Sequence, residues 1–173
     1  MNFFIAGTTP RQFAPRYELS CSWWLWRRLL AGLRSRGRGV RESGAFLLGM
    51  EDNSGARRIA DFLLYDDLDP HALDTGIIRL DGRHFGKLWE YCGKRGMTVI
   101  ADVHTHPGSA GQSGSDRAHP IIAQAGHLAL IVPNFAASPA KREELGIYRY
   151  GGAGQWKTIP AHRCREFFHI GIF

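Results

Sequence analysis

Two histidines and an aspartate lie close together in the middle of the chain. His104 and His106 are separated by one residue, and Asp116 follows within the next ten. Imidazole nitrogens and carboxylate oxygens are ligands that Zn²⁺ takes in proteins, and three of them leave a fourth tetrahedral position open for water, as in a catalytic zinc site. We therefore interpret His104, His106 and Asp116 as the ligands of a catalytic zinc ion.

The residues around the histidines predict how the three ligands come together. The run 97–103 is apolar and β-branched, which predicts a buried strand with the histidines at or just beyond its end. Side chains two positions apart in an extended chain point to the same face, so both imidazoles can reach one ion. Pro107 and the glycines after it predict a loop that curls back and returns Asp116 to the same ion.

A histidine pair at a strand end is common without a metal, but here it is part of a longer pattern. His-x-His-Pro, a short spacer rich in glycine and serine, and Ser-x-x-Asp resemble the metal-binding motif of the JAB/MPN (JAMM) metalloprotease family. That motif also has a glutamate on the strand after the first long helix, and Glu42 opens a Glu-x-Gly segment in that place. The spacer after Pro107 is one residue shorter than the family's usual form, which leaves either Ser113 or Ser115 as the motif's serine.

The resemblance implies a role for each residue of the motif. His104, His106 and Asp116 would hold the zinc ion. Glu42 would take a proton from water and pass it to the leaving amine, and Ser113 would donate a hydrogen bond to the oxyanion. From the residues alone, a salt bridge is the alternative for Glu42, because a carboxylate at the mouth of an apolar strand needs a partner.

The resemblance also implies a fold and a substrate. The fold would be an α/β sandwich of JAB/MPN type, similar to cytidine deaminases, with a mixed, largely antiparallel sheet flanked by helices. Members of the family cleave peptide or isopeptide bonds after the C-terminal glycine of ubiquitin or ubiquitin-like proteins, and the small size of this chain resembles the compact, deubiquitinase-like prokaryotic branch. We therefore expect a zinc-dependent isopeptidase that acts on a ubiquitin-like protein or its conjugates, with activating and conjugating enzymes of the same pathway as further partners.

Two alternatives remain beside this function. One is a non-catalytic JAB-type scaffold or a DNA-repair-associated protein, in which the fold only mediates contacts. The other is a zinc hydrolase that acts on a sulfur-carrier protein or a small amide. The complete set of motif residues argues against the scaffold, because a degenerate member would lack metal ligands.

Length and cysteine content limit the class of protein. The chain has 173 residues, enough for one domain over 1–173 with its own core. Cys21, Cys92 and Cys164 are far apart and odd in number, which indicates neither a disulfide framework nor a Cys-x-x-Cys zinc site. No apolar run reaches the length of a membrane span, and the first residues lack the features of a signal peptide, so we expect a cytoplasmic protein without a membrane partner.

The charge of the chain favours an acidic partner. The net charge is +6 and the pI is near 9.6. Many of the basic residues surround the first predicted helix, without interleaved aromatic residues or a known nucleic-acid motif. We therefore expect an acidic protein partner rather than a nucleic acid. The arginines of this cluster are Arg27, Arg28, Arg34, Arg36, Arg38 and Arg41.

Local patterns predict the other elements of the chain. We expect an irregular arm over 1–15, a short strand over 16–20, and an amphipathic helix from Trp23 to Gly37 or Gly39 that Ser20 or Ser22 caps. Later elements are a hairpin of strands 43–50 and 58–65, an acidic, solvated loop over 66–80, a helix over 81–94, a helix from Asp116 to about Gln124, strands over 126–134, 145–150 and 155–159, and a tail over 160–173. His119 and His127 are expected to pack or to support the site, not to bind the metal.

Overall fold

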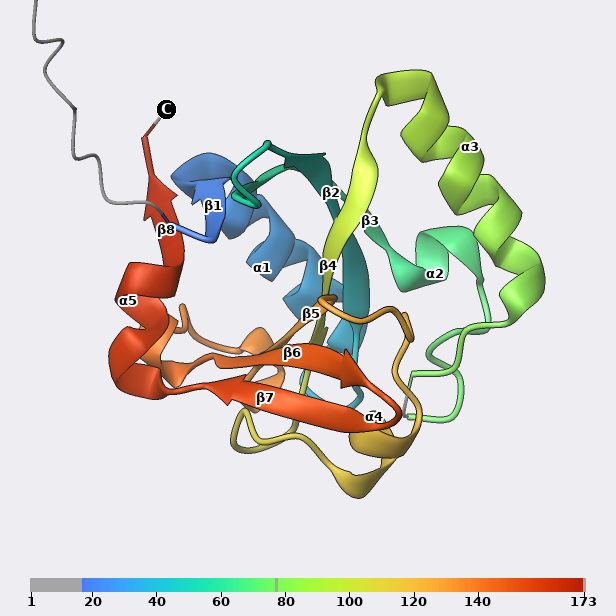
Figure 1. Ribbon diagram of the computed structural model, residues 1–173. Coiled ribbons are helices and arrows are strands. Elements are labelled where there is room, and N and C mark those ends of the chain that lie inside the picture. Colours follow the sequence, from blue (N-terminus) through green and yellow to red (C-terminus); the bar gives the residue numbers. More distant parts are fainter. Residues whose placement is uncertain (1–16, 77, 173) are drawn as a thin grey trace, which may run out of the picture.

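A mixed sheet of eight strands forms the middle of the computed structural model, which describes residues 17–76 and 78–172 (Figure 1). The strands are β1 (Leu19–Ser22), β2 (Gly44–Glu51), β3 (Arg57–Leu64), β4 (Thr98–Thr105), β5 (Leu128–Val132), β6 (Gly146–Gly152), β7 (Gln155–Ile159) and β8 (Phe168–Gly171). The helices are α1 (Trp23–Gly37), α2 (Tyr65–Leu68), α3 (Phe85–Arg95), α4 (Gly114–Ala118) and α5 (Cys164–Phe167). In space the strands follow the order β7-β6-β5-β4-β2-β3-β1-β8.

The pairing of the strands is mixed, as the sequence predicts. Neighbours pair antiparallel from β7 to β5 and from β4 to β3, whereas β4–β5, β3–β1 and β1–β8 are parallel. The parallel pair β4–β5 matters most for the site. Because the two strands run in the same direction, their carboxyl ends lie at the same edge of the sheet, and the loops that follow them meet there.

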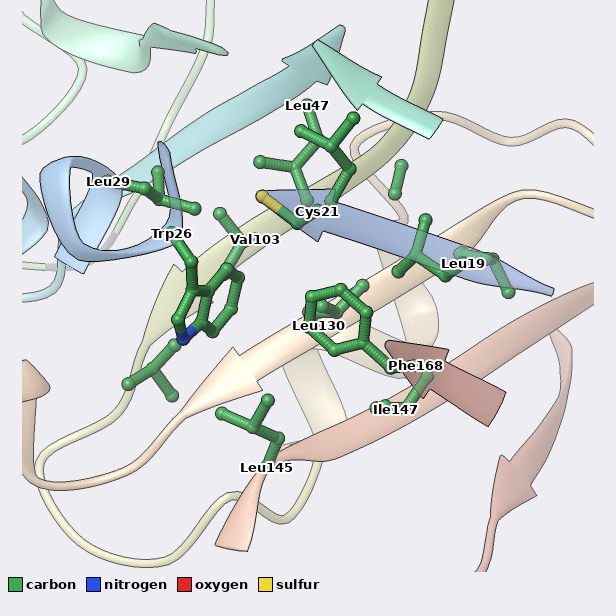
Figure 2. Packing of buried hydrophobic residues seen from close by; sticks show 14 of the residues in the cluster. Leu19, Cys21, Trp26, Leu29, Leu47, Val103, Leu130, Leu145, Ile147 and Phe168 are labelled. Atoms are coloured by element: carbon green, nitrogen blue, oxygen red, sulfur yellow. The ribbon is translucent and has the colours of Figure 1, made fainter. Parts of the chain in front are cut away.

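One face of the sheet packs against α1. Ser22 caps this helix by accepting a hydrogen bond from the backbone of Leu25 at 3.3 Å, one of the two caps that the sequence allows. Gly37 ends the helix, and the next residue adopts a left-handed conformation. The apolar stripe of α1 is buried against side chains of the central strands and of β8 (Figure 2); the residues drawn there include Trp26, Leu29, Leu47, Val103, Leu130 and Phe168.

The other face of the sheet packs against α2 and α3. Alternation along β2 divides its side chains between the two faces: Ala45 and Leu47 join the core beneath α1, and Phe46 and Leu48 join the core beneath α3. A strand that is buried on both faces is a continuous apolar run, as β2 is. The sheet therefore lies between two helical layers (Figure 1).

Several sequence predictions are confirmed within a residue or two. These are the first helix, the hairpin of β2 and β3, and the strands β4 to β7. The helix predicted over 81–94 is a 3-10 turn over Gly82–His84 followed by α3, which begins at Phe85. The strand predicted over 16–20 is β1, which begins at Leu19. The loop predicted over 66–80 contains the short helix α2 at its start. The predicted arm over 1–15 lies outside the described residues. None of the helices within 17–76 and 78–172 has the length and hydrophobicity of a membrane span.

The helix predicted from Asp116 to about Gln124 is wrong in both bounds. It is α4, which begins two residues earlier and ends at Ala118. Ser113 caps it and so fixes its start before Asp116. Pro120 disfavours helical geometry at His119, whose φ of −128° and ψ of 68° lie outside the helix.

The C-terminal tail expected over 160–173 instead contains α5 and β8. The strand β8 pairs in parallel with β1, and its Phe168 is fully buried with its ring edge-on to Trp26. This pairing joins the first and the last strand of the described chain. A four-residue strand with no clear alternation gives no local signal for such a contact.

Candidate metal centre

The two histidines lie at the carboxyl end of β4, where the sequence predicts them. The Nε2 atoms of His104 and His106 are 3.0 Å apart, and both residues are nearly buried. The backbone of His106 continues the sheet beyond the strand, because its N–H donates to the carbonyl of Val132 at 3.0 Å. Neighbouring strands therefore hold both imidazoles on one face, as alternation along an extended chain requires.

Asp116 reaches the histidines from the first turn of α4. Its Oδ2 lies 3.2 Å from Nε2 of His106, and its Oδ1 lies 3.7 Å from Nε2 of His104. Ser113 holds it there through a capping box: Oγ of Ser113 accepts from the backbone N–H of Asp116 at 3.1 Å, and the backbone N–H of Ser113 donates to Oδ2 of Asp116 at 2.7 Å. Ser113 is thus the serine that is hydrogen-bonded to Asp116.

The spacing of these three groups fits a tetrahedral metal site. Metal–ligand bonds of about 2.0–2.1 Å in a tetrahedron place neighbouring ligand atoms about 3.3 Å apart. The two Nε2 atoms are 3.0 Å apart, and Nε2 of His106 is 3.2 Å from Oδ2 of Asp116, both close to that value. Nε2 of His104 is 3.7 Å from the other oxygen of the carboxylate, Oδ1. Two imidazole nitrogens and one carboxylate oxygen are also a donor set that suits zinc and similar divalent ions. His104, His106 and Asp116 therefore form a group that could hold a metal ion.

Charge is concentrated in this group. Burial raises the pKa of Asp116, but hydrogen bonds from His104 and His106 outweigh it and bring the pKa well below the usual range of a carboxyl. The hydrogen bond to Asp116 raises the pKa of His106 although burial opposes it. Without a metal, the carboxylate therefore favours a proton on His106, and a metal ion would compete with that proton for the same nitrogen.

Glu42 lies beside the three ligands and is held by its own neighbours. The register of β2 on β4 pairs Gly44 with His104, so Glu42, two residues earlier, lies across from His106. Oε1 of Glu42 is 3.9 Å from Nε2 of His106, which is close enough for an ion pair when the imidazole is protonated. Burial raises the pKa of Glu42, while the nearby histidines lower it. The salt bridge considered for Glu42 from the sequence would thus have protonated His106 as its partner.

The segment that carries Glu42 is fixed on both sides. Ser43 exchanges hydrogen bonds with Thr105: its N–H donates to Oγ1 of Thr105 at 3.0 Å, and its carbonyl accepts from the N–H of Thr105 at 2.9 Å. Oγ of Ser43 donates to the carbonyl of Leu33 in α1 at 2.8 Å. Gly44 has no room for a side chain, because a Cβ atom there would lie 2.3 Å from the ring of Tyr65. These contacts give a physical reason for the Glu-x-Gly pattern.

A pocket of about 220 Å³ opens onto the site. Glu42, His104, Ser113 and Asp116 line it on one side. The rest of its lining is formed by Ile78, Asp102, Gln112, Ser115, His119, Pro120, Ile121, Ala129 and Trp156. Ser115, the other candidate for the motif's serine, therefore also borders the pocket.

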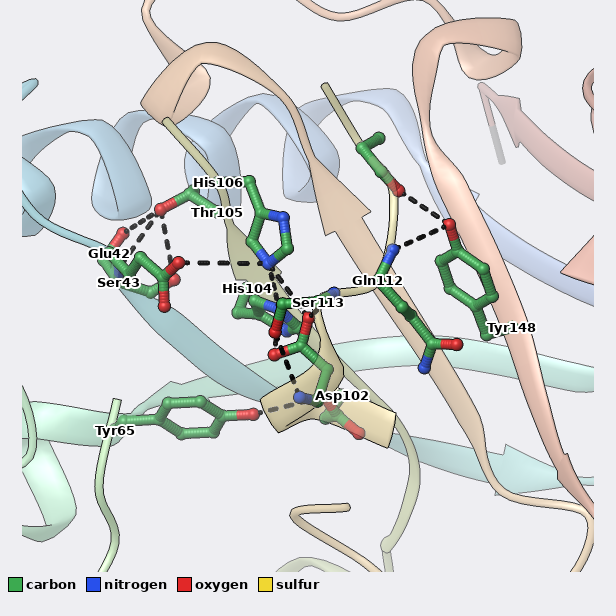
Figure 3. Close-up of polar contacts among 12 residues, drawn as sticks. Glu42, Ser43, Tyr65, Asp102, His104, Thr105, His106, Gln112, Ser113 and Tyr148 are labelled. Carbon is green, nitrogen blue, oxygen red and sulfur yellow. Dashed lines mark hydrogen bonds and ion pairs between the residues drawn. The ribbon is translucent and has the colours of Figure 1, made fainter. Parts of the chain in front are cut away.

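The loop between the histidines and α4 is tied to β6. The hydroxyl of Tyr148 donates to the carbonyl of Ala110 at 2.8 Å and accepts from the N–H of Gln112 at 3.2 Å (Figure 3). Gly146 lets the loop approach, since a Cβ atom there would lie 2.0 Å from the carbonyl oxygen of Ala110. This anchoring fixes the path that returns Asp116 to the site.

Sequence reasoning missed a buried polar pair behind the histidines. Nε2 of His127 lies 2.6 Å from Oδ1 of Asp102, and the hydroxyl of Tyr65 donates to Oδ2 of Asp102 at 3.4 Å. His127 thus lies outside the metal group, as does His119. The signal for Asp102 was available, because it stands two residues before His104 on the same face of β4.

Comparisons with known proteins relate part of the chain to a metalloprotease. No protein-family profile matches the chain. Over 78 residues, which are 45% of this chain and 47% of the other, it is 37% identical to a protein of Sinorhizobium fredii named "Probable metalloprotease y4jG". The chain thus spans about half the length of this curated relative.

Solved structures that resemble the fold include the following two. Protein DSY2949 from Desulfitobacterium hafniense superposes with a TM-score of 0.61 and 17% identity, over 82% of this chain and 90% of that one. A protein from Salinibacter ruber gives a TM-score of 0.51 and 19% identity, over 76% and 85% of the two chains. At these identities the likeness concerns the mixed α/β fold alone.

Proposed function

We propose that this protein is a zinc-dependent peptidase or isopeptidase of the JAB/MPN (JAMM) type that cleaves after the C-terminal glycine of a ubiquitin-like protein. The observation that carries the proposal is the grouping of His104, His106 and Asp116 around one point, where they could hold a metal ion. Glu42 lies beside this group, with its Oε1 atom 3.9 Å from Nε2 of His106. The partial similarity to a named metalloprotease supports the same class of reaction.

Each residue of the site has a task in amide hydrolysis. His104, His106 and Asp116 would hold Zn²⁺, which when bound lowers the pKa of water and polarises the carbonyl under attack. Glu42 accepts the proton of the attacking water and delivers it to the leaving amine. Its carboxylate is partly buried and lies 3.9 Å from Nε2 of His106, and burial raises its pKa, which suits a group that accepts a proton and gives it up again.

The serine would stabilise the charge that develops on the substrate. Oγ of Ser113 already accepts a hydrogen bond from Asp116, and its hydroxyl proton is free to be donated to another group. A donor aimed at the carbonyl oxygen is most useful when that oxygen becomes negative. Ser113 thus has two tasks in the proposal, because it positions a ligand and donates to the oxyanion.

The pocket favours a substrate with a slender end. The pocket has a volume of about 220 Å³. Besides the site residues, the large side chains of Ile78, Ile121 and Trp156 form its walls. A glycine tail brings its backbone close to a surface because it has no side chain. The C-terminal glycine of a ubiquitin-like protein would therefore enter the pocket, whereas a residue with a larger side chain would collide with these walls.

The proposal is tested with two matched substrates. A ubiquitin-like domain is joined through its terminal glycine to the side chain of lysine, and in the second substrate leucine replaces that glycine. We expect the zinc-loaded protein to cleave the first substrate and to cleave the second at least about ten-fold more slowly, since the added side chain must fit a small pocket. Equal cleavage of both, or cleavage of small amides alone, would contradict the proposed substrate.

A further inference from the structure

A second, larger cavity lies on the α1 face of the sheet, away from α3. Its volume is about 980 Å³, and its walls are α1 on one side and residues 136–143 on the other, with Arg165 and Ile170 beside them. We refer to it as the α1 groove. Its apolar lining includes Trp26, Leu30 and Ala140. Its basic lining consists of Arg27, Arg34, Arg38, Lys141, Arg142 and Arg165.

The structure divides the arginine cluster of the sequence into two sets. One set serves the fold: Arg28 pairs with Asp61, Arg36 pairs with Asp66 and Asp67, and Arg41 donates to a backbone carbonyl. The other set, Arg27, Arg34 and Arg38, lines the α1 groove. No ion pair to a carboxylate of the described residues engages this second set.

The acidic side chain in the lining does not balance this charge. Glu143 borders the groove but is paired with Arg165. The remaining basic side chains face the groove without a carboxylate partner among residues 17–76 and 78–172. Much of the chain's net charge of +6 is therefore gathered at one concave surface, where it attracts anionic groups from a distance.

We propose that the α1 groove binds an acidic segment of a partner protein that carries aliphatic side chains between its Asp and Glu residues. The basic side chains would pair with the carboxylates, and the apolar lining would take the aliphatic groups. A cavity of about 980 Å³ is large enough for several residues of such a segment.

The lining fits a peptide better than a nucleic acid. Leu30, Ala140 and their apolar neighbours offer no hydrogen bonds to phosphate or base edges. The guanidinium of Arg27 lies over the ring of Trp23 at 4.7 Å and covers a face on which a base would stack. Aliphatic side chains of a peptide need neither hydrogen-bonding groups nor an open aromatic face in the lining.

The α1 groove and the metal centre share one turn of the backbone. The N–H of Phe135 donates to the carbonyl of His106 at 2.8 Å, and the next residue, Ala136, lines the groove. Asn134, Phe135 and Ala136 all have φ between 51° and 56°, a left-handed run that is costly for such residues. A partner held in the α1 groove would thus lie on the other side of this turn from the candidate metal centre. The partner could then be the substrate itself, an inference that rests on the proposed function.

The test measures binding to the full-length protein. The probe is a fluorescein-labelled peptide that alternates Glu with Leu, and fluorescence anisotropy follows its binding at low ionic strength. Two control peptides replace Glu with Gln or Leu with Ser. We expect binding of the Glu/Leu peptide only, with an affinity that falls as salt is added.

Charge reversal locates the site of binding. Arg27→Glu should weaken binding about ten-fold, because an attraction is replaced by a repulsion. Lys87→Glu makes the same change of charge on α3, on the other face of the sheet, and should leave binding unchanged. Arg34→Gln is a milder second variant that keeps the test valid if Arg27→Glu unfolds, and thermal unfolding checks both proteins.

Three results would overturn the proposal. They are equal weakening by Arg27→Glu and Lys87→Glu, binding of the Gln peptide as tight as that of the Glu peptide, and tighter binding of duplex DNA that Arg27→Glu removes. Because no turnover is measured, a failure here leaves the proposed peptidase activity untouched, and loss of that activity would leave the binding result standing.

Discussion

Asp116 reaches the histidines because Ser113 fixes the start of α4. The two residues exchange hydrogen bonds at 3.1 and 2.7 Å, so the rotamer of the carboxylate depends on the cap. A helix of five residues has few other contacts that define its first turn. The Ser-x-x-Asp pattern therefore has a structural reason that does not depend on catalysis.

Ser113→Ala should weaken metal binding while the fold remains. Loss of a serine cap costs about 0.5–2 kcal/mol of local stability, and loss of a group that orients a ligand commonly lowers metal affinity about 10- to 100-fold. Competition with a chelator of known affinity measures the change. Ser113→Thr keeps the hydroxyl and serves as the control. Unchanged metal affinity in Ser113→Ala would show that Asp116 is held by other contacts.

The ion pair at the site should make the stability of the metal-free protein depend on pH. The pKa of His106 is raised from 6.5 by its hydrogen bond to Asp116, so its proton stabilises the folded state below that value, and the stabilisation is lost as the pH rises through the folded pKa. The lowered pKa of Asp116 acts in the other direction, and only as the pH falls below the ordinary carboxyl range.

We therefore expect the Tm of the chelator-treated protein to fall as the pH rises from about 6 to about 8. Thermal unfolding across that range is the measurement, with His106→Gln as the matched control. The control should show a flatter dependence because it has no proton to lose. The same slope in both proteins would mean that other groups dominate.

Among the elements, β2 has the strictest requirements. It is buried on both faces, and its first residue, Gly44, lies against the ring of Tyr65 with no space for a methyl group. Because β2 also carries the chain from Glu42 into the sheet, its position sets that of the carboxylate. Stability and the geometry of the site are therefore coupled at this strand.

Gly44→Ala should destabilise the protein by about 2 to 3 kcal/mol, because the new methyl group must displace the ring of Tyr65 or the backbone of β4. Urea unfolding measures the change. Gly86→Ala is the matched control: it lies in α3 with nothing within 4 Å of its Cβ, and alanine there should stabilise the helix by up to about 1 kcal/mol. Equal stability of the two variants would remove the steric explanation.

The sequence predicted those elements that have a local signal. Apolar runs and alternation predict β2, β4 and β5, and the apolar stripe that begins at Trp23 predicts the start of α1, with either Ser20 or Ser22 as its cap. The metal group followed from the same reasoning, since alternation places His104 and His106 together. The Ser-x-x-Asp spacing is also a capping-box pattern, and the box that Ser113 forms with Asp116 starts α4 at Gly114, two residues before the predicted start.

Long-range contacts left no such signal. The pairing of β8 with β1 joins two short strands across almost the whole described chain. The division of the arginines into paired and unpaired sets depends on which carboxylates the fold brings near, for example Asp66 and Asp67 beside Arg36. The pair of Asp102 and His127 likewise needs the parallel alignment of β4 and β5.

At the scale of the whole molecule, two different surfaces meet at one turn. The candidate metal centre has a small pocket with three acidic side chains, and the α1 groove is larger and basic. The turn at 134–136 borders the groove and is hydrogen-bonded to His106. This arrangement would allow a partner to be held on one side of the turn while a bond is cleaved on the other.

The most direct test of the proposed function separates metal binding from chemistry by one substitution, Glu42→Gln. In the proposed site the histidines and Asp116 are the zinc ligands and Glu42 is not, so this variant should keep its zinc and its fold. Glutamine cannot take the proton of water, and loss of a positioned base lowers the rate by about a hundred- to ten-thousand-fold. Zinc content and turnover of the glycine-linked substrate are measured on the same preparation. Full zinc with turnover lost is the predicted result, and full zinc with turnover like that of the unaltered protein would contradict the account.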